Sequence, residues 1–117
     1  VVVAGDRVIG RGHNLVETLG DATAHAEMQA ITAAMSTLGG KYLSDSTLYV
    51  TVEPCVMCAG ASAWCQVGRV VWGADDPKRG SSRHTPSLFH SRTKITRGVL
   101  ATECEALMTE FFKKLRR

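Results

Sequence analysis

Short runs of apolar, mostly β-branched residues alternate with polar and glycine-containing segments along the chain. Bounded by turn-forming residues, such runs predict β-strands at residues 1–4, 7–12, 47–52, 69–74 and 94–99. Gly5 and Asp6 form a turn dipeptide between the first two runs, which predicts a hairpin. The third run is typical of a central strand because it is mostly apolar. Gly98 weakens the fifth run.

A different spacing follows in residues 23–38, where Met28, Ile31 and Met35 recur at steps of three and four. This period predicts an amphipathic helix. Thr23 is placed to cap the start of the helix, and the two glycines that follow the segment end it.

Two more helices are expected in the second half of the chain. Residues 55–67 are small and apolar nearly all round, and Pro54 stands where helices often begin, so this helix is expected to be buried on every side. The last helix is expected over residues 100–117. Its apolar stripe consists of Cys104, Leu107, Met108, Phe111 and Leu115. Residues 13–21 carry no clear period and residues 75–91 are rich in turn formers, so both segments are expected to be loops.

Strands that alternate with helices predict an α/β sandwich, with helices covering a central sheet. The 117 residues suit one domain, residues 1–117. No apolar stretch approaches the roughly 20 residues that cross a membrane, and the N-terminus lacks the pattern of a signal peptide, so we expect a cytoplasmic protein that binds no membrane. Because the chain opens on an apolar run without Met, we expect it to be a fragment that lacks an N-terminal element.

The charge is distributed unevenly, although the net charge is only +3. Residues 1–76 hold four Lys and Arg against eight Asp and Glu, whereas residues 77–117 hold ten against three. A basic half of this kind indicates a polyanionic partner. A basic face that serves only solubility is the alternative, and the charge alone does not separate the two.

Candidate chemistry is concentrated in two short segments, one around His25 and Glu27 and the other around Cys55 and Cys58. On a helix that opens at Pro54 the two cysteines share one face of the first turn, where the helix dipole favours thiolate. Read separately, the first segment is an ordinary amphipathic helix start and the second a structural half-site or redox pair. Together they predict zinc held by one imidazole and two thiolates, with a fourth position open for catalysis.

The remaining candidates near this site have different roles. Two residues apart on a helix, His25 and Glu27 do not both reach one ion, so Glu27 is placed to carry protons. Cys65 lies two turns beyond Cys58, about 10 Å along the axis, and is out of reach. It is expected to be structural, as is Cys104 on the apolar stripe.

The pattern H-x-E followed by P-C-x-x-C is the signature of the zinc-dependent cytidine/deoxycytidylate deaminase superfamily. Within it the sequence resembles bacterial tRNA-specific adenosine deaminases over most of its length. The resembling segments are residues 8–10 (VIG), 13–14 (HN), 22–27 (ATAHAE), 47–61 (TLYVTVEPCVMCAGA), 68–74 (GRVVWGA), 98–101 (GVLA), 103–104 (EC) and 111–112 (FF). The resemblance implies a cytidine deaminase-like three-layer α/β/α sandwich with a mixed sheet of about five strands.

It also implies one Zn²⁺ per chain on His25, Cys55 and Cys58, with Glu27 as the catalytic proton carrier. Asn14 and Ala26 are expected to contact the substrate, and a homodimer is expected. The chain departs from the family in the segment after Gly73, which is shorter and lacks the family's His-Pro and Asn-His pairs; a further departure is Ala22, which replaces a proline.

Three functions stay open at this stage. The first is a hydrolytic deaminase that converts adenosine to inosine in a tRNA anticodon loop, and the second is a deaminase of a free base or nucleoside. The third is a zinc-stabilised RNA-binding module without catalysis, which the open ligand position and Glu27 disfavour. Expected RNA contacts are Lys78, Arg79, Arg83, Phe111, Phe112, Lys113, Lys114, Arg116 and Arg117. One of the two phenylalanines is expected in the core stripe and the other against a loop nucleotide.

Overall fold

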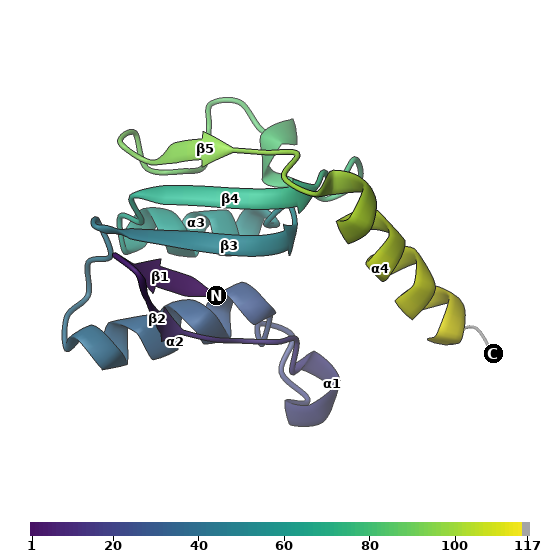
Figure 1. Cartoon of the computed structure of the whole chain (residues 1–117), viewed down its shortest axis with the longest axis horizontal. Helices are drawn as coiled ribbons and strands as arrows, with labels where there is room; N and C mark the ends of the chain where they lie inside the picture. Colours follow the sequence, from purple (N-terminus) through teal and green to yellow (C-terminus); the bar gives the residue numbers. More distant parts are fainter. Residues whose placement is uncertain (116–117) are drawn as a thin grey trace.

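The structure, a computed structural model, describes residues 1–115 as strands and helices around one sheet (Figure 1). The strands are β1 (Val2–Ala4), β2 (Arg7–Gly10), β3 (Ser46–Val52), β4 (Arg69–Ala74) and β5 (Lys94–Thr96). The α-helices are α1 (Val16–Leu19), α2 (Ala26–Leu38), α3 (Val56–Trp64) and α4 (Ala101–Leu115), with a short 3₁₀-helix at Ser81–Arg83. The α/β class predicted from the sequence is confirmed.

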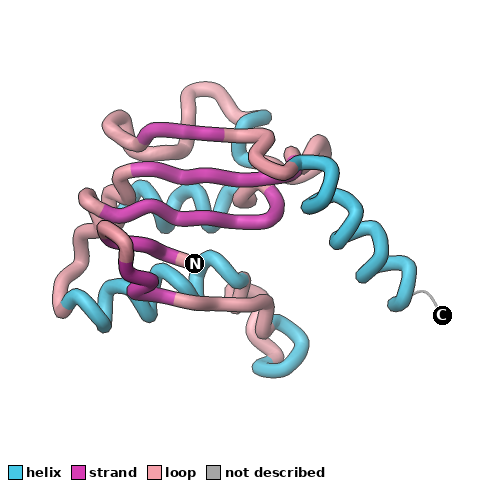
Figure 2. The backbone as a smooth tube through the Cα atoms, in the orientation of Figure 1, coloured by secondary structure: helices cyan, strands magenta, loops and turns pink. Residues whose placement is uncertain are grey.

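The sheet has five strands in the order β2-β1-β3-β4-β5 (Figure 2). Strand β1 pairs antiparallel with both β2 and β3, so the predicted hairpin is present. Strands β3, β4 and β5 run parallel to one another. The sheet is therefore mixed, and the carboxyl ends of β3 and β4 meet at one edge, where Val52 lies opposite Ala74.

Helices α2 and α3 cover one face of the sheet, as Figure 1 shows. The core lies between them and the strands. Its larger buried members are Val2, Ile9, Ile31, Leu43, Leu48, Val67, Val70 and Trp72. Because alternate residues of a strand point to opposite faces, Val70 and Trp72 face this layer, whereas Gly73 faces the other.

Helix α4 covers part of the opposite face and completes the third layer. The helix lies close to β4. The side chain of Cys104 packs directly on Gly73, where an added Cβ would overlap it. Beyond this contact the helix extends away from the sheet (Figure 1). Of the predicted apolar stripe, Cys104 and Met108 are partly buried, but Leu107 and Phe111 are exposed.

Three local predictions need correction near the helices of the first half. Residues 13–21 hold the short helix α1, which is too brief to show a period in the sequence. Helix α2 begins at Ala26 with His25 as its N-cap, not at Thr23. The reason is local: the carboxylate of Asp21 accepts hydrogen bonds from the backbone N–H and the hydroxyl of Thr23, at 2.8 and 2.7 Å, which forms a turn in place of a helix start.

Two predictions for the second half also differ from the structure. Helix α3 is buried on one side only, because Val56 is 44% and Trp64 88% exposed. Strand β5 ends at Thr96, and Gly98 follows in a left-handed conformation with φ at 81°. Within residues 1–115, none of the helices is long and apolar enough to cross a membrane.

Candidate metal centre and substrate cavity

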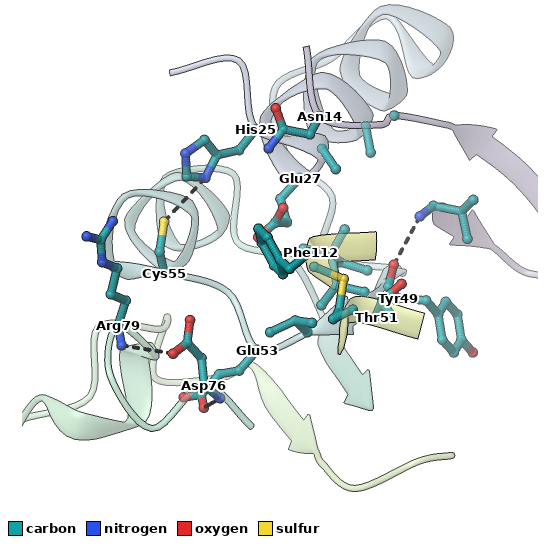
Figure 3. Close-up of a pocket in the computed structure, with 18 residues that line it drawn as sticks. Asn14, His25, Glu27, Tyr49, Thr51, Glu53, Cys55, Asp76, Arg79 and Phe112 are labelled. Atoms are coloured by element: carbon teal, nitrogen blue, oxygen red, sulfur yellow. Dashed lines mark hydrogen bonds between the residues drawn. The ribbon is translucent and has the colours of Figure 1, made fainter. Parts of the chain in front are cut away.

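A cavity of about 490 Å³ opens where β3 and β4 end and where α2 and α3 begin. Ligands of open α/β sheets commonly bind at the carboxyl ends of strands. The volume lies within the range of sites for small organic molecules. Figure 3 shows the lining residues, which come from segments that are far apart in the sequence.

Three potential metal ligands converge beside this cavity. His25 is the N-cap of α2 and Cys55 is the N-cap of α3, and Cys58 lies one turn into α3. The Nδ1 atom of His25 is 3.6 Å from the sulfur of Cys55 and 3.7 Å from that of Cys58. Zn–S and Zn–N bonds of about 2.3 and 2.0 Å at a tetrahedral angle put nitrogen and sulfur about 3.5 Å apart. The donor set and its spacing therefore fit zinc.

The two thiols lie in different surroundings. Cys58 is fully buried, whereas Cys55 is partly exposed and lines the cavity. Burial raises the pKa of the Cys58 thiol, and the nearby carboxylate of Glu27 raises it further. In the metal-free protein Cys58 is therefore a thiol, and a divalent cation has to displace its proton on binding.

Glu27 is the second residue of α2 and lines the same cavity. Among residues 1–115, no carboxylate joins the group of ligand atoms formed by His25, Cys55 and Cys58. In this structure Glu27 lies in the cavity beside the candidate metal ligands but outside their group. This is the arrangement that the spacing of His25 and Glu27 predicts.

Asn14 and Ala26 also line the cavity. The Oδ1 atom of Asn14 accepts a hydrogen bond from the N–H of Val16 at 2.9 Å, an Asx turn just before α1, and its NH₂ group is left to donate elsewhere. Ala26 is the first residue of α2, and its N–H is among those that have no acceptor within the helix.

The residues expected to contact RNA separate into two groups. Arg79 and Phe112 line the main cavity, and Lys113 and Phe112 line a neighbouring cavity of about 610 Å³ between α4 and residues 74–77. The others in the described part of the chain lie outside both cavities: Lys78, Arg83, Phe111 and Lys114. Arg116 and Arg117 lie outside the described residues.

The expectation that one phenylalanine joins the core is wrong. Phe111 is 54% and Phe112 49% exposed, because α4 extends away from the sheet. The two rings contact each other edge to face, with centroids 5.4 Å apart.

The other two cysteines are separate from the metal centre. Cys65 is buried in the core, and its sulfur lies 3.5 Å from the carbonyl oxygen of Ser62. Cys104 packs against β4 at Gly73. Both positions agree with the structural roles expected of them.

Sequence reasoning assigned no role to Glu53 and Asp76, which line the cavity, and it placed Met108 only on the apolar stripe of the last helix. Glu53 is the most unusual, since it is a carboxylate only 4% exposed. An acidic residue directly after an apolar strand, and directly before Pro54, is the signal in the sequence that points to it.

Comparison with known proteins agrees with this geometry. A family model described as MafB19-like deaminase matches residues 1–116. The tRNA-specific adenosine deaminase of Bacillus subtilis (strain 168) is 43% identical over 122 residues, which cover 100% of this chain and 76% of the relative.

Solved structures of deaminases are similar to this chain in both fold and sequence. One from biochemical and structural studies of A-to-I editing by tRNA:A34 deaminases has a TM-score of 0.83 and 37% identity, over 91% of this chain and 80% of the other. A guanine deaminase from Bacillus subtilis has a TM-score of 0.63 and 43% identity, over 64% of this chain and 48% of the other. The fold, the spacing of the ligand residues and these relatives together identify the chain as a member of the MafB19-like deaminase family.

Proposed function

We propose that this protein is a zinc-dependent hydrolase that converts adenosine to inosine in the anticodon loop of a tRNA, with release of ammonia. The observation that carries the proposal is the group of His25, Cys55 and Cys58 beside a cavity that also holds Glu27. The choice of tRNA as the substrate is supported by relatives described as tRNA-specific adenosine deaminases.

In this proposal the three ligands hold one zinc ion per chain. When bound, zinc supplies the Lewis acidity that lowers the pKa of a water molecule toward neutrality. Glu27 accepts a proton from the attacking water as a C–O bond forms at C6 of the adenine. Glu27 delivers that proton to N1. It then takes the remaining water proton from the hydroxyl on C6 and passes it to the amino group, so that the C6–N bond breaks as the C6=O bond forms and ammonia leaves.

The substrate is held by the rest of the cavity. The NH₂ group of Asn14 and the backbone N–H of Ala26 are hydrogen-bond donors for the base or its ribose. The guanidinium of Arg79 provides a contact for a flanking phosphate, and the exposed ring of Phe112 provides a stacking surface for a loop nucleotide. Lys78, Arg83, Lys113 and Lys114 are further positive charges that the proposal assigns to contacts with RNA phosphates.

The experiment is an ammonia-release assay run in parallel on an anticodon stem-loop, the corresponding nucleoside and free guanine and cytosine. Inosine in the digested stem-loop, with little turnover of the small compounds, is the expected result. Turnover of a free base with none of the stem-loop would favour the second candidate, a small-molecule deaminase. That candidate is kept because guanine deaminases share the fold and the cavity suits a free base.

The proposal includes a homodimer in the cytoplasm. Exposed apolar side chains on the outer side of α3, Val56 and Trp64, support a contact with a second copy. Light scattering after size exclusion tests the assembly, and a monomer at all concentrations would contradict it.

A further inference from the structure

Glu53 has an environment that is costly for an acid unless it is fully hydrogen-bonded. It follows β3 directly and is buried. One carboxylate oxygen accepts the N–H of Asp76 at 3.0 Å, and the other accepts the N–H of Ser82 at 2.8 Å. A single side chain therefore holds both ends of the loop formed by residues 76–82.

The 76–82 loop is organised around this carboxylate. Oδ1 of Asp76 accepts the N–H groups of Lys78 and Arg79, each at 3.0 Å, and the N–H of Gly80 donates to the carbonyl of Asp76 at 2.9 Å. A Cβ added at Gly80 would overlap the carboxyl group of Glu53, so the loop lies directly on that side chain.

The same loop is joined to the metal centre. Gly80 forms an isolated antiparallel β-bridge with Cys55, and the N–H of Ser81 donates to the carbonyl of Pro54 at 3.0 Å. The side chain of Arg79 lines the cavity that Cys55 also lines, and Figure 3 shows Arg79, Asp76, Glu53 and Cys55 around one part of it.

We propose that Glu53 is a positioning residue for the deamination reaction. It holds the 76–82 loop so that Arg79 stands at the cavity beside Cys55. Both carboxylate oxygens are engaged by loop amides, so Glu53 acts through the loop and not on the substrate. The inference rests on the proposed function, because a phosphate contact by Arg79 matters only for a nucleic-acid substrate.

The first test follows the loop itself and needs no substrate. Glu53→Gln replaces one acceptor oxygen by an NH₂ group that faces a backbone N–H donor. Loss of one charge-assisted hydrogen bond raises the equilibrium constant for local opening of the loop by about 10- to 100-fold. Trypsin should therefore cut after Lys78 and Arg79 faster by that factor, while the cut after exposed Lys41 keeps its rate. Equal rates at the loop in both proteins would overturn the proposal.

The second test measures the coupling between Glu53 and Arg79 on the stem-loop substrate. Glu53→Gln and Arg79→Ala should each raise KM by about tenfold, and the double variant should be no worse than either alone. Zinc content should stay at one per chain in all three. The matched control is Glu17→Gln, which removes an exposed acid from α1 and should leave KM unchanged.

The outcomes are distinguishable. Additive effects on KM, or loss of zinc from Glu53→Gln, would overturn the positioning role. If Glu53→Gln does not fold, Gly80→Ala attacks the same contact from the loop side and should give the same pattern of trypsin cleavage. If the unaltered protein leaves the stem-loop unchanged, the proposed function fails, while the cleavage rates still decide whether Glu53 holds the loop.

Discussion

Replacing Glu27 by Gln tests the proposed proton transfer most directly. Gln has nearly the shape of Glu but cannot accept a proton from water, so the cavity should keep its form while the chemistry stops. General acid–base catalysis contributes about 10²- to 10⁴-fold to a rate, or roughly 3 to 5 kcal/mol of barrier. We therefore expect kcat to fall by about 10²- to 10⁴-fold, measured as inosine released from the digested stem-loop.

The structure predicts a different outcome for the metal in this variant. The candidate ligands are His25, Cys55 and Cys58, so zinc should remain at one per chain if Glu27 is not a ligand. The negative charge of Glu27 raises the pKa of the Cys58 thiol, and its removal therefore makes the thiolate easier to form. Elemental analysis measures zinc on the same samples, and Glu110→Gln, which alters an exposed acid of α4, serves as the control.

Two results would refute this reasoning. Loss of zinc from Glu27→Gln would mean that the carboxylate is a ligand. An unchanged kcat with full zinc would mean that another group carries the protons.

Four further predictions concern the metal, the pH, the RNA and the assembly. The double variant Cys55→Ala/Cys58→Ala should lose its zinc, since one imidazole remains of the three ligands; full zinc occupancy on elemental analysis would sink the assignment. Because the pKa of the Cys58 thiol is raised, zinc binding should release a proton there and zinc affinity should rise with pH by about tenfold per unit for each proton displaced, measurable by calorimetry in two buffers. Truncation after Phe112 removes four positive charges, so RNA affinity should weaken and its log–log salt slope should flatten by at most about 3, with the fold retained by circular dichroism; an unchanged slope contradicts a role for the tail. Trp64→Ser should shift a dimer toward monomer in light scattering without unfolding the protein, because this side chain is exposed in the single chain.

Much of the architecture could be predicted because apolar runs, turn-forming residues and helical spacing are strong local signals in this sequence. Strand β4 coincides with the predicted residues 69–74, and the hairpin forms around Gly5 and Asp6. The positions of His25, Cys55 and Cys58 follow from one helix start each, so their proximity required only that α2 and α3 pack side by side.

What escaped prediction depends on long-range packing or on side chains that compete with the backbone. Helix α2 begins later than predicted because the carboxylate of Asp21 accepts hydrogen bonds from Thr23 and forms a turn there. The exposure of Phe111 and Phe112 depends on the angle at which α4 leaves the sheet, which no periodicity encodes. The partners of Glu53 lie 23 and 29 residues away along the chain, so its role depends on the folded loop.

The N-cap residues of α2 and α3 link the order of the backbone to occupancy of the candidate metal site. Helices α2 and α3 begin at His25 and Cys55, and neither residue makes a side-chain hydrogen bond to its helix. Each helix therefore lacks a polar side-chain cap, worth about 1 kcal/mol, and carries a candidate metal ligand at that position. In the proposed function zinc would hold both helix ends in place instead, so its removal should loosen the first turns of α2 and α3 together. Amide hydrogen exchange in those two turns would then report metal occupancy from the backbone, before any loss of global stability is seen.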